Sequence, residues 1–271
     1  KKIKRHFDVP ITYYISPQLW AWKKRRIKII RKYVDQMLVI FHFEENWYKK
    51  RGVNAKFVGH PIFDEWSPTP KHDLCNLLGL KSDKPVLALY PGSRKQELNR
   101  HLPLFIMVAE KLRNKSSEIQ FILGLAPELN LEHFSIPVWI QVEKDYPQKV
   151  LECASVALVA SGSATVEAAV FGTPMIIIYK MAFLSWWLSK LLVKTDYAGM
   201  VNIIAGKKIM PEYLQNQATA KTITNEVFEI INSPERQREM RYELLGVHHR
   251  LQGSGSSKGA AQHILSLTES K

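Results

Sequence analysis

Two short segments in the middle of the chain have residue types that suit phosphate binding, and each joins a predicted strand to a predicted helix. In residues 91–94 (PGSR), glycine lets the backbone approach a ligand, and arginine can hold a phosphate through two parallel hydrogen bonds. In residues 161–165 (SGSAT), small side chains leave N–H groups of a helix N-terminus free for an anion. Each segment alone is more simply an ordinary turn. Together, at the ligand-binding carboxyl edge of one sheet, they favour a phosphate-bearing nucleotide.

Glu167 lies about one helical turn beyond the second segment, where its carboxylate could accept hydrogen bonds from sugar hydroxyls. The simpler interpretation is a favourable acidic residue in the first turn of a helix. The chain contains neither GxxxxGK[ST] nor GxGxxG, so the sequence favours neither a P-loop ATPase nor an NAD-dependent enzyme.

Other catalytic patterns are weak. Nine histidines are scattered without an HExxH motif, and the two cysteines belong to no spaced Cys/His set, so we expect no metal site and no disulfide framework. His101 and Glu97 lie one helical turn apart and are interpreted as a surface pair. His60, at the end of a predicted strand, is interpreted as a structural histidine.

Strands that alternate with helices must position these residues, which predicts an α/β fold with a doubly wound parallel sheet. The expected strands are 11–15, 37–41, 56–58, 86–90, 119–123, 138–142, 156–160 and 175–179, and the main expected helices are 18–33, 44–50, one after residue 94, 148–154 and 164–171. The chain after residue 179 is expected to be helical, with breaks at Gly199, Gly206, Pro211 and Pro234. Because three strands are few for an independent doubly wound sheet, residues 1–60 are expected to be the rear part of a domain. The proline-rich stretch 61–85 is interpreted as a linker.

The chain carries a formal net charge of +13, and most of the excess is local. Residues 1–32 contain eleven lysines and arginines but one acidic residue, Asp8. A solvated helix face is one interpretation. The other is an anionic partner, either a membrane surface or nucleic acid, because tryptophan beside lysine suits both the lipid headgroup zone and base stacking. The candidate surface residues are Trp20, Trp22, Lys23, Lys24, Arg25 and Arg26.

Residues 183–193 (FLSWWLSKLLV) are apolar on more than one face. We interpret them as core slightly more readily than as a helix lying in a bilayer surface. No apolar run reaches the ~20 residues that a spanning helix needs, and no signal peptide is expected.

Several segments, in order along nearly the whole chain, resemble the lipid-A-disaccharide synthase family. Residues 16–22 (SPQLWAW) are similar to its SPxxWAW segment, residues 91–97 to its PGSRxxE turn and residues 161–167 (SGSATVE) to its SGTATLE-type motif, which other nucleotide-sugar transferases share. Further similar segments are residues 194–197 (KTDY), 202–206 (NIIAG) and 211–215 (PEYLQ).

The resemblance implies a GT-B glycosyltransferase, a hexosyltransferase with two Rossmann-like domains. Residues 1–62 would be the rear part of an acceptor-side and membrane-side domain, 63–85 a linker, 86–215 the nucleotide-sugar-binding domain and 216–271 C-terminal helices. The implied reaction transfers 2,3-diacylglucosamine from its UDP donor to lipid X, forming the β-1,6 lipid A disaccharide and releasing UDP. The implied enzyme uses no metal or other cofactor and is peripheral on the cytoplasmic face of the bacterial inner membrane.

The resemblance also implies roles for individual residues. The donor-binding residues would be Gly92, Ser93 and Arg94 at the phosphates, Gly162, Ser163, Ala164 and Thr165 at the pyrophosphate, Glu167 at the ribose, and Asn202 and Gln215 along the donor site. The family's first glycine-containing loop, and the acidic residue that acts as its base, have no counterpart in this chain. We therefore expect the catalytic base to be missing, so that the chain binds its donor without turnover.

Alternatives stay open from the residues alone. One is a UDP-sugar transferase that uses another lipid-linked acceptor, which an acyl requirement in the donor would distinguish. A less favoured one is a nucleic-acid-binding protein that uses the basic N-terminal helix and shows steeply salt-dependent affinity. A third is a sensor that binds a UDP-sugar without consuming it. Acyl-chain length and oligomeric state are not predicted.

Overall fold

The computed structural model describes residues 2–21, 24–181, 196–253 and 255–269, and these form two compact units. The first unit comprises the residues up to 67 together with those from 249 onward, and the second comprises 68–181 and 196–248. This division by compactness differs from the expected boundaries at 62, 85 and 215. In particular, α5 (Lys71–Leu77), from the expected linker, packs on α7 (Pro147–Cys153) within the second unit.

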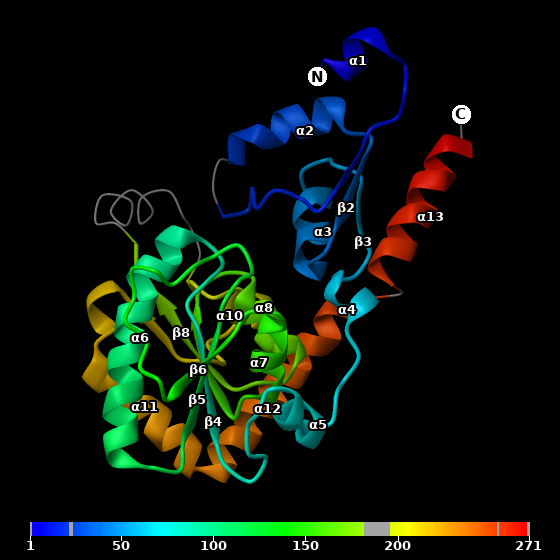
Figure 1. Ribbon diagram of the computed structural model, residues 1–271. Coiled ribbons are helices and arrows are strands. Elements are labelled where there is room, and N and C mark those ends of the chain that lie inside the picture. The colour runs from blue at the N-terminus through cyan, green and yellow to red at the C-terminus, as the bar shows by residue number, and fades with distance from the viewer. Residues whose placement is uncertain (1, 22–23, 182–195, 254, 270–271) are drawn as a thin grey trace. The chain divides into compact units, whose positions relative to one another are not determined.

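Within the described residues of the first unit, three parallel strands form a smaller sheet in the order β1 (Thr12–Tyr14), β2 (Gln36–Val39) and β3 (Ala55–Phe57), close to the expected strands. All of β2 is buried, and Met37 and Val39 pack with Tyr48 in one core cluster. The helices of this unit are α1 (Ile3–His6), the 3₁₀ turn η1 (Lys24–Arg26), α2 (Ile27–Tyr33), α3 (His42–Lys49), α4 (Ile62–Glu65) and α13 (Ser256–Glu269) (Figure 1).

The last helix, α13, is fixed to the first unit by a backbone crossing and a carboxylate cap. The backbone passes so close at Gly253 that a Cβ added there would lie 2.6 Å from the Cα of Gly59. The Oδ1 of Asp64 accepts the N–H of Ser256 at 2.9 Å, and its Oδ2 accepts the N–H of Ser257 at 2.8 Å. The side chain of Asp64 therefore satisfies N–H groups at the start of a helix far away in the sequence.

The helix expected over residues 18–33 is wrong at its beginning. Residues 19–21 form a turn, in which the N–H of Ala21 donates to the carbonyl of Gln18, and the described helical segment starts with η1 at Lys24. Aromatic residues lose side-chain freedom in a helix. Here the tertiary hydrogen bond from the Trp20 indole to Glu44 decides the local conformation. Trp22 and Lys23, like the apolar segment 183–193, lie outside the described residues.

In the second unit, the described residues include six parallel strands that form a larger sheet in the order β6-β5-β4-β7-β8-β9. The strands are β4 (Val86–Tyr90), β5 (Gln120–Gly124), β6 (Ile140–Glu143), β7 (Val156–Ala160), β8 (Met175–Tyr179) and β9 (Glu212–Leu214). The five expected strands of this region are confirmed, with β6 beginning two residues later than predicted. After residue 179 only helices and breaks were expected, and this is wrong at residues 212–214, where β9 adds an edge strand beside β8.

Helices cover both faces of the larger sheet. Figure 1 shows α6 (Lys95–Lys115) and α11 (Ala220–Asn232) on one side, and α7 and α8 (Ala164–Val170) on the other. Every residue of β7 is buried, as are the first four of β4 and of β8, which is typical of parallel strands covered on both faces. The remaining elements are α10 (Met200–Ala205), the 3₁₀ turn η2 (Gln215–Gln217) and α12 (Pro234–Leu251).

Candidate functional site

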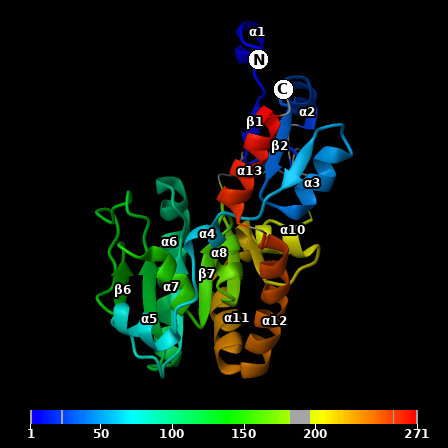
Figure 2. The same cartoon turned by 90° about the vertical axis from the view of Figure 1, so that its right-hand side faces the viewer.

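The two glycine-containing turns leave neighbouring strands at the same edge of the larger sheet. β4 pairs with β7 in parallel, and its last residue, Tyr90, lies opposite Val159 near the end of β7. From β4 the chain continues outward to β5, whereas from β7 it continues to β8 on the other side. Figure 2 shows β6 at the outer edge of this sheet and β7 farther in. The turns therefore flank a topological switch point, where open α/β sheets form their ligand crevice, and the expected common edge is confirmed.

Glu97 organises the first turn. Its Oε2 accepts the backbone N–H groups of Ser93 at 3.1 Å and Arg94 at 3.3 Å, so it caps the start of α6 from inside the helix. Gly92 has φ of 108°, and a Cβ there would lie 2.4 Å from the same Oε2, so only glycine fits. The side chain of Arg94 is 82% exposed, with its Nη1 3.4 Å from Glu97 Oε1. Sequence reasoning predicted this arginine but not the capping role of Glu97.

The second turn keeps some N–H groups free and uses others. In the described part of the chain, the N–H groups of Gly162, Ser163 and Ala164 have no hydrogen-bond partner. Thr165 is fully buried, and both its hydroxyl (2.8 Å) and its N–H (3.2 Å) donate to the carbonyl of Gly162. Thr165 was expected to offer its N–H to a pyrophosphate, but this N–H is engaged inside the turn, so the residue shapes the loop instead.

Glu167 lies in the first turn of α8 with its carboxylate largely buried. Its Oε2 has no hydrogen-bond partner among the described residues. Burial raises the pKa of this carboxyl group above its ordinary value. Buried polar atoms in proteins are usually paired, so an unpaired carboxylate oxygen beside the second turn indicates a place where a ligand hydroxyl could donate.

The side chain of Asn202 is fully buried and saturated by the chain itself. Its Nδ2 donates to the carbonyl of Met210 at 2.9 Å and to Glu212 Oε1 at 2.8 Å, while its Oδ1 accepts the N–H groups of Ile209 and Met210, both at 2.9 Å. In this arrangement the amide does not line a surface, contrary to its expected place along the donor site. It holds the segment that leads into β9.

Glu212 connects this segment to the second turn. Its carboxylate oxygens accept the N–H groups of Ala198 at 3.0 Å and Gly199 at 2.8 Å. The carbonyl of Ala198 in turn accepts the hydroxyl of Ser161 at 2.7 Å. The residues before α10 are therefore fixed beside the loop that follows β7.

Gln215 lies directly after β9. Because Leu214, the last residue of β9, lies opposite Tyr179 at the end of β8, Gln215 is at the same edge of the larger sheet as the two turns. It adopts φ of 49°, which is uncommon for a residue other than glycine. Its Nε2 is buried and has no hydrogen-bond partner among the described residues. Strained backbone and an unpaired buried donor are both features that cluster at ligand sites.

His101, interpreted from the sequence as part of a surface pair, is instead buried beneath this edge, with 2% of its surface exposed. The sequence pattern placed it on α6 but could not show that its ring faces the sheet. His60 is half-buried, and burial lowers its pKa to about 4, which agrees with a structural histidine.

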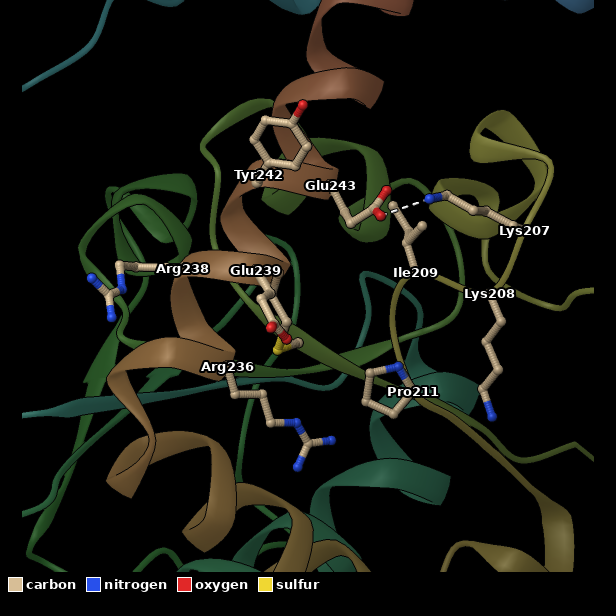
Figure 3. Close-up of a pocket in the computed structure, with 10 residues that line it drawn as sticks. Lys207, Lys208, Ile209, Pro211, Arg236, Arg238, Glu239, Tyr242 and Glu243 are labelled. Atoms are coloured by element: carbon tan, nitrogen blue, oxygen red, sulfur yellow. Dashed lines mark hydrogen bonds and ion pairs between the residues drawn. The ribbon is translucent and has the colours of Figure 1, made fainter.

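A cavity of about 610 Å³ lies at the other end of β9, lined by residues 207–209, by Pro211 and by the first turns of α12. Three of its six charged lining residues form ion pairs: Lys207 pairs with Glu243 at 2.6 Å, and Arg236 pairs with Glu229 at 3.2 Å and with Glu226. Figure 3 shows the guanidinium group of Arg238 pointing away from Lys207 and Lys208. The cations therefore do not converge on a common ligand.

Among the described candidates for the expected lipid-facing surface, one residue is not exposed. Trp20 is 8% exposed, and its Nε1 donates to Glu44 Oε1 at 2.9 Å, so its assignment as a membrane-facing residue is wrong. Burial raises the pKa of Glu44 to about 7. Lys24, Arg25 and Arg26 are exposed. The described part of the chain contains no helix that is both long and apolar enough to cross a bilayer, and no cluster of three or more potential metal ligands.

Comparison with known proteins identifies close relatives. A family model described as Lipid-A-disaccharide synthetase matches residues 1–264. The chain is 38% identical to the lipid-A-disaccharide synthase of Coxiella burnetii (strain Dugway 5J108-111), over 94% of this chain and 68% of that protein. It is 37% identical to the lipid-A-disaccharide synthase of Syntrophus aciditrophicus, over 96% of this chain and 70% of that protein.

Solved structures share the fold at low sequence identity. The UDP-GlcNAc 2-epimerase from Neisseria meningitidis bound to UDP-GlcNAc has a TM-score of 0.62 at 12% identity, covering 95% of this chain and 70% of that chain. The calicheamicin glycosyltransferase CalG4 has a TM-score of 0.60 at 13% identity, covering 96% and 70%. These similarities confirm the expected GT-B type of α/β fold.

Proposed function

Because the chain belongs to the lipid-A-disaccharide synthase family of hexosyltransferases, which make the lipid A disaccharide, we propose that a UDP-sugar donor binds at the carboxyl edge of its larger sheet. The observation that carries the proposal is the pair of turns on adjacent strands β4 and β7. One presents the exposed guanidinium group of Arg94, and the other presents free N–H groups beside the unpaired carboxylate oxygen of Glu167.

In this proposal each group contacts a different part of the donor. Arg94 and the N–H groups of residues 162–164 bind the diphosphate, because cationic and N–H donors pair strongly with phosphate oxygens. Glu167 accepts hydrogen bonds from the ribose hydroxyls, and the unpaired Nε2 of Gln215 donates to the donor molecule. Glu97, Thr165, Asn202 and Glu212 hold the loops in place through the hydrogen bonds described above.

The chemistry is an inverting displacement at the anomeric carbon. The 6-hydroxyl oxygen of the acceptor bonds to that carbon while the bond to the β-phosphate oxygen breaks, and UDP leaves with an additional negative charge. Arg94 and the N–H groups of the second turn stabilise that charge, which is the kind of interaction that lowers barriers most. None of the residues described above is assigned as the base that removes the acceptor proton.

The specific substrates we propose are UDP-2,3-diacylglucosamine as donor and lipid X as acceptor, supported by membership of the family. The competing assignment is a transferase that uses another lipid-linked acceptor. Equal affinity for the acylated donor and for UDP-N-acetylglucosamine would favour the competitor, because a chain that recognises acyl groups gains affinity from burying them.

We propose that the second unit is the nucleotide-sugar-binding domain and that the first unit faces the acceptor and the membrane. The first unit exposes Lys24, Arg25 and Arg26 together with apolar side chains such as Phe7, 63% exposed, and Ile29, 55% exposed. Cationic and apolar groups together suit an anionic lipid surface, here the cytoplasmic face of the bacterial inner membrane.

Calorimetric titration of the chain with UDP, UMP and uridine tests the proposed donor site. Removing the β-phosphate should weaken binding about tenfold or more, since one charge-assisted contact contributes roughly 1.5–3 kcal/mol. If the chain does not bind UDP but binds single-stranded RNA with an affinity that rises steeply as the salt concentration falls, it is instead the nucleic-acid-binding protein considered above.

A further inference from the structure

His101 is a buried side chain that joins two loops at the carboxyl edge of the larger sheet. Its Nδ1 lies 3.1 Å from the carbonyl oxygen of Pro91, the first residue after β4. Its Nε2 lies 3.2 Å from the backbone nitrogen of Lys180, the first residue after β8. β7 separates β4 from β8 in the sheet, so the ring links the loops on either side of the strand that precedes the second turn.

The two partners fix the protonation state of the ring. The N–H of Lys180 can only donate, so Nε2 must carry a lone pair, and the ring hydrogen must sit on Nδ1, from which it donates to the Pro91 carbonyl. Burial lowers the pKa of His101, which keeps the ring neutral. A neutral imidazole is therefore a rigid bridge with one donor and one acceptor, and both are used.

An apolar residue at this position could fill the same space but could not replace the bridge. The Pro91 carbonyl and the Lys180 N–H would each lose a buried partner. Pro91 is followed directly by Gly92, whose φ of 108° suits only glycine, and then by Ser93 and Arg94, whose N–H groups donate to Glu97. Without the hydrogen bond from His101 to the Pro91 carbonyl, the turn after β4 would shift relative to the turn after β7.

We propose that His101 is a positioning residue for donor binding, which holds the turn at Pro91 and the chain at Lys180 so that Arg94 and the loop after β7 reach one diphosphate. The inference rests on the proposed function, because it assigns a purpose to the geometry of that same edge. His101 touches no donor atom in this proposal and acts through the backbone of the turn.

The test compares three variants by calorimetry with UDP and by thermal unfolding. His101→Leu removes both hydrogen bonds and should raise the Kd for UDP about tenfold, since small misplacements of binding groups are costly. His101→Gln keeps one donor and one acceptor and should recover most of the affinity. Leu112→Ala, the matched control, damages the buried face of α6 far from the turn and should change the Kd less than about twofold, even if it lowers the Tm as much.

The outcomes separate the two proposals. A wild-type chain that does not bind UDP rejects the proposed function itself. If the wild-type chain binds UDP and His101→Leu binds it with the same Kd, only the role of His101 is rejected. The same holds if His101→Leu and Leu112→Ala lose equal affinity for UDP. Should His101→Leu not fold, nitrogen NMR of the wild-type chain decides: UDP should shift the ring nitrogens of His101 while Nδ1 stays protonated, and an unresponsive ring would overturn the inference.

Discussion

Glu44 is a carboxyl group that the first unit buries almost completely, at 1% exposure, beside the indole of Trp20. Burial raises its pKa to about 7, although hydrogen bonds from Trp20 and its other neighbours favour the charged form. The folded state therefore binds this proton more tightly than the unfolded state does. As the pH rises from 4.5 to about 7, the unfolded chain loses the proton first, so the contribution of Glu44 to stability falls over this range.

We predict that Glu44→Gln makes the free energy of unfolding less dependent on pH. The variant keeps an acceptor for the Trp20 N–H but has no charge to bury. Its stability relative to wild type should rise from pH 5 to pH 8 by on the order of 2–3 kcal/mol. Urea unfolding followed by tryptophan fluorescence measures this. Glu45→Gln, at the neighbouring and more exposed position, is the comparison variant. Parallel pH curves for wild type and Glu44→Gln would contradict the raised pKa of the Glu44 carboxyl group.

Sequence could identify the residue types of the candidate site but not what each side chain contacts. Gly92, Arg94 and Glu167 were predicted from turn chemistry and lie at the expected edge. Asn202 was expected to line the donor site and Thr165 to offer its N–H to the pyrophosphate, yet the Asn202 amide and the Thr165 N–H and hydroxyl are all hydrogen-bonded inside the protein. Whether a polar side chain faces inward depends on partners distant in the chain, and a local pattern does not contain them.

At the scale of elements, long apolar strands were predictable because burial on both faces leaves an uninterrupted hydrophobic run. β9 was missed because it has three residues and begins directly after Pro211, which resembles a break. The start of the helix expected at Gln18 was misplaced because the indole of Trp20 is held by Glu44, 24 residues further along the chain. The second error comes from a tertiary contact that overrides local preference.

The crossing between Gly59 and Gly253 gives a prediction about how α13 is held. Gly253→Ala should lower the free energy of unfolding by about 1–3 kcal/mol, because its methyl group would overlap the Gly59 backbone. Gly246→Ala in α12 is the matched control: its Cβ would meet no atom within 4 Å, and alanine should stabilise the helix by roughly 0.5–1 kcal/mol. If urea unfolding ranks both variants alike, the backbone crossing is not a determinant of stability.

For the whole molecule, the distribution of charge leads to a prediction about membranes. The triple variant Lys24→Gln, Arg25→Gln, Arg26→Gln should bind vesicles containing phosphatidylglycerol at least about tenfold more weakly, since each basic residue near an anionic surface contributes about 1 kcal/mol. The triple variant Lys207→Gln, Lys208→Gln, Arg238→Gln removes equal charge from the second unit and should bind nearly as wild type does. Co-sedimentation measures both. Equal losses would show that net charge, and not the N-terminal surface, governs binding.

The account depends most on the claim that the turns after β4 and β7 jointly hold the diphosphate of an activated sugar. Calorimetry of UDP with Arg94→Ala and Lys111→Ala tests it most directly, because both variants remove one exposed cation from α6 or its cap. Arg94→Ala should weaken UDP binding about 10- to 100-fold, equivalent to roughly 1.5–3 kcal/mol, while Lys111→Ala should bind as wild type does. Equal Kd values for the two variants would contradict the claim.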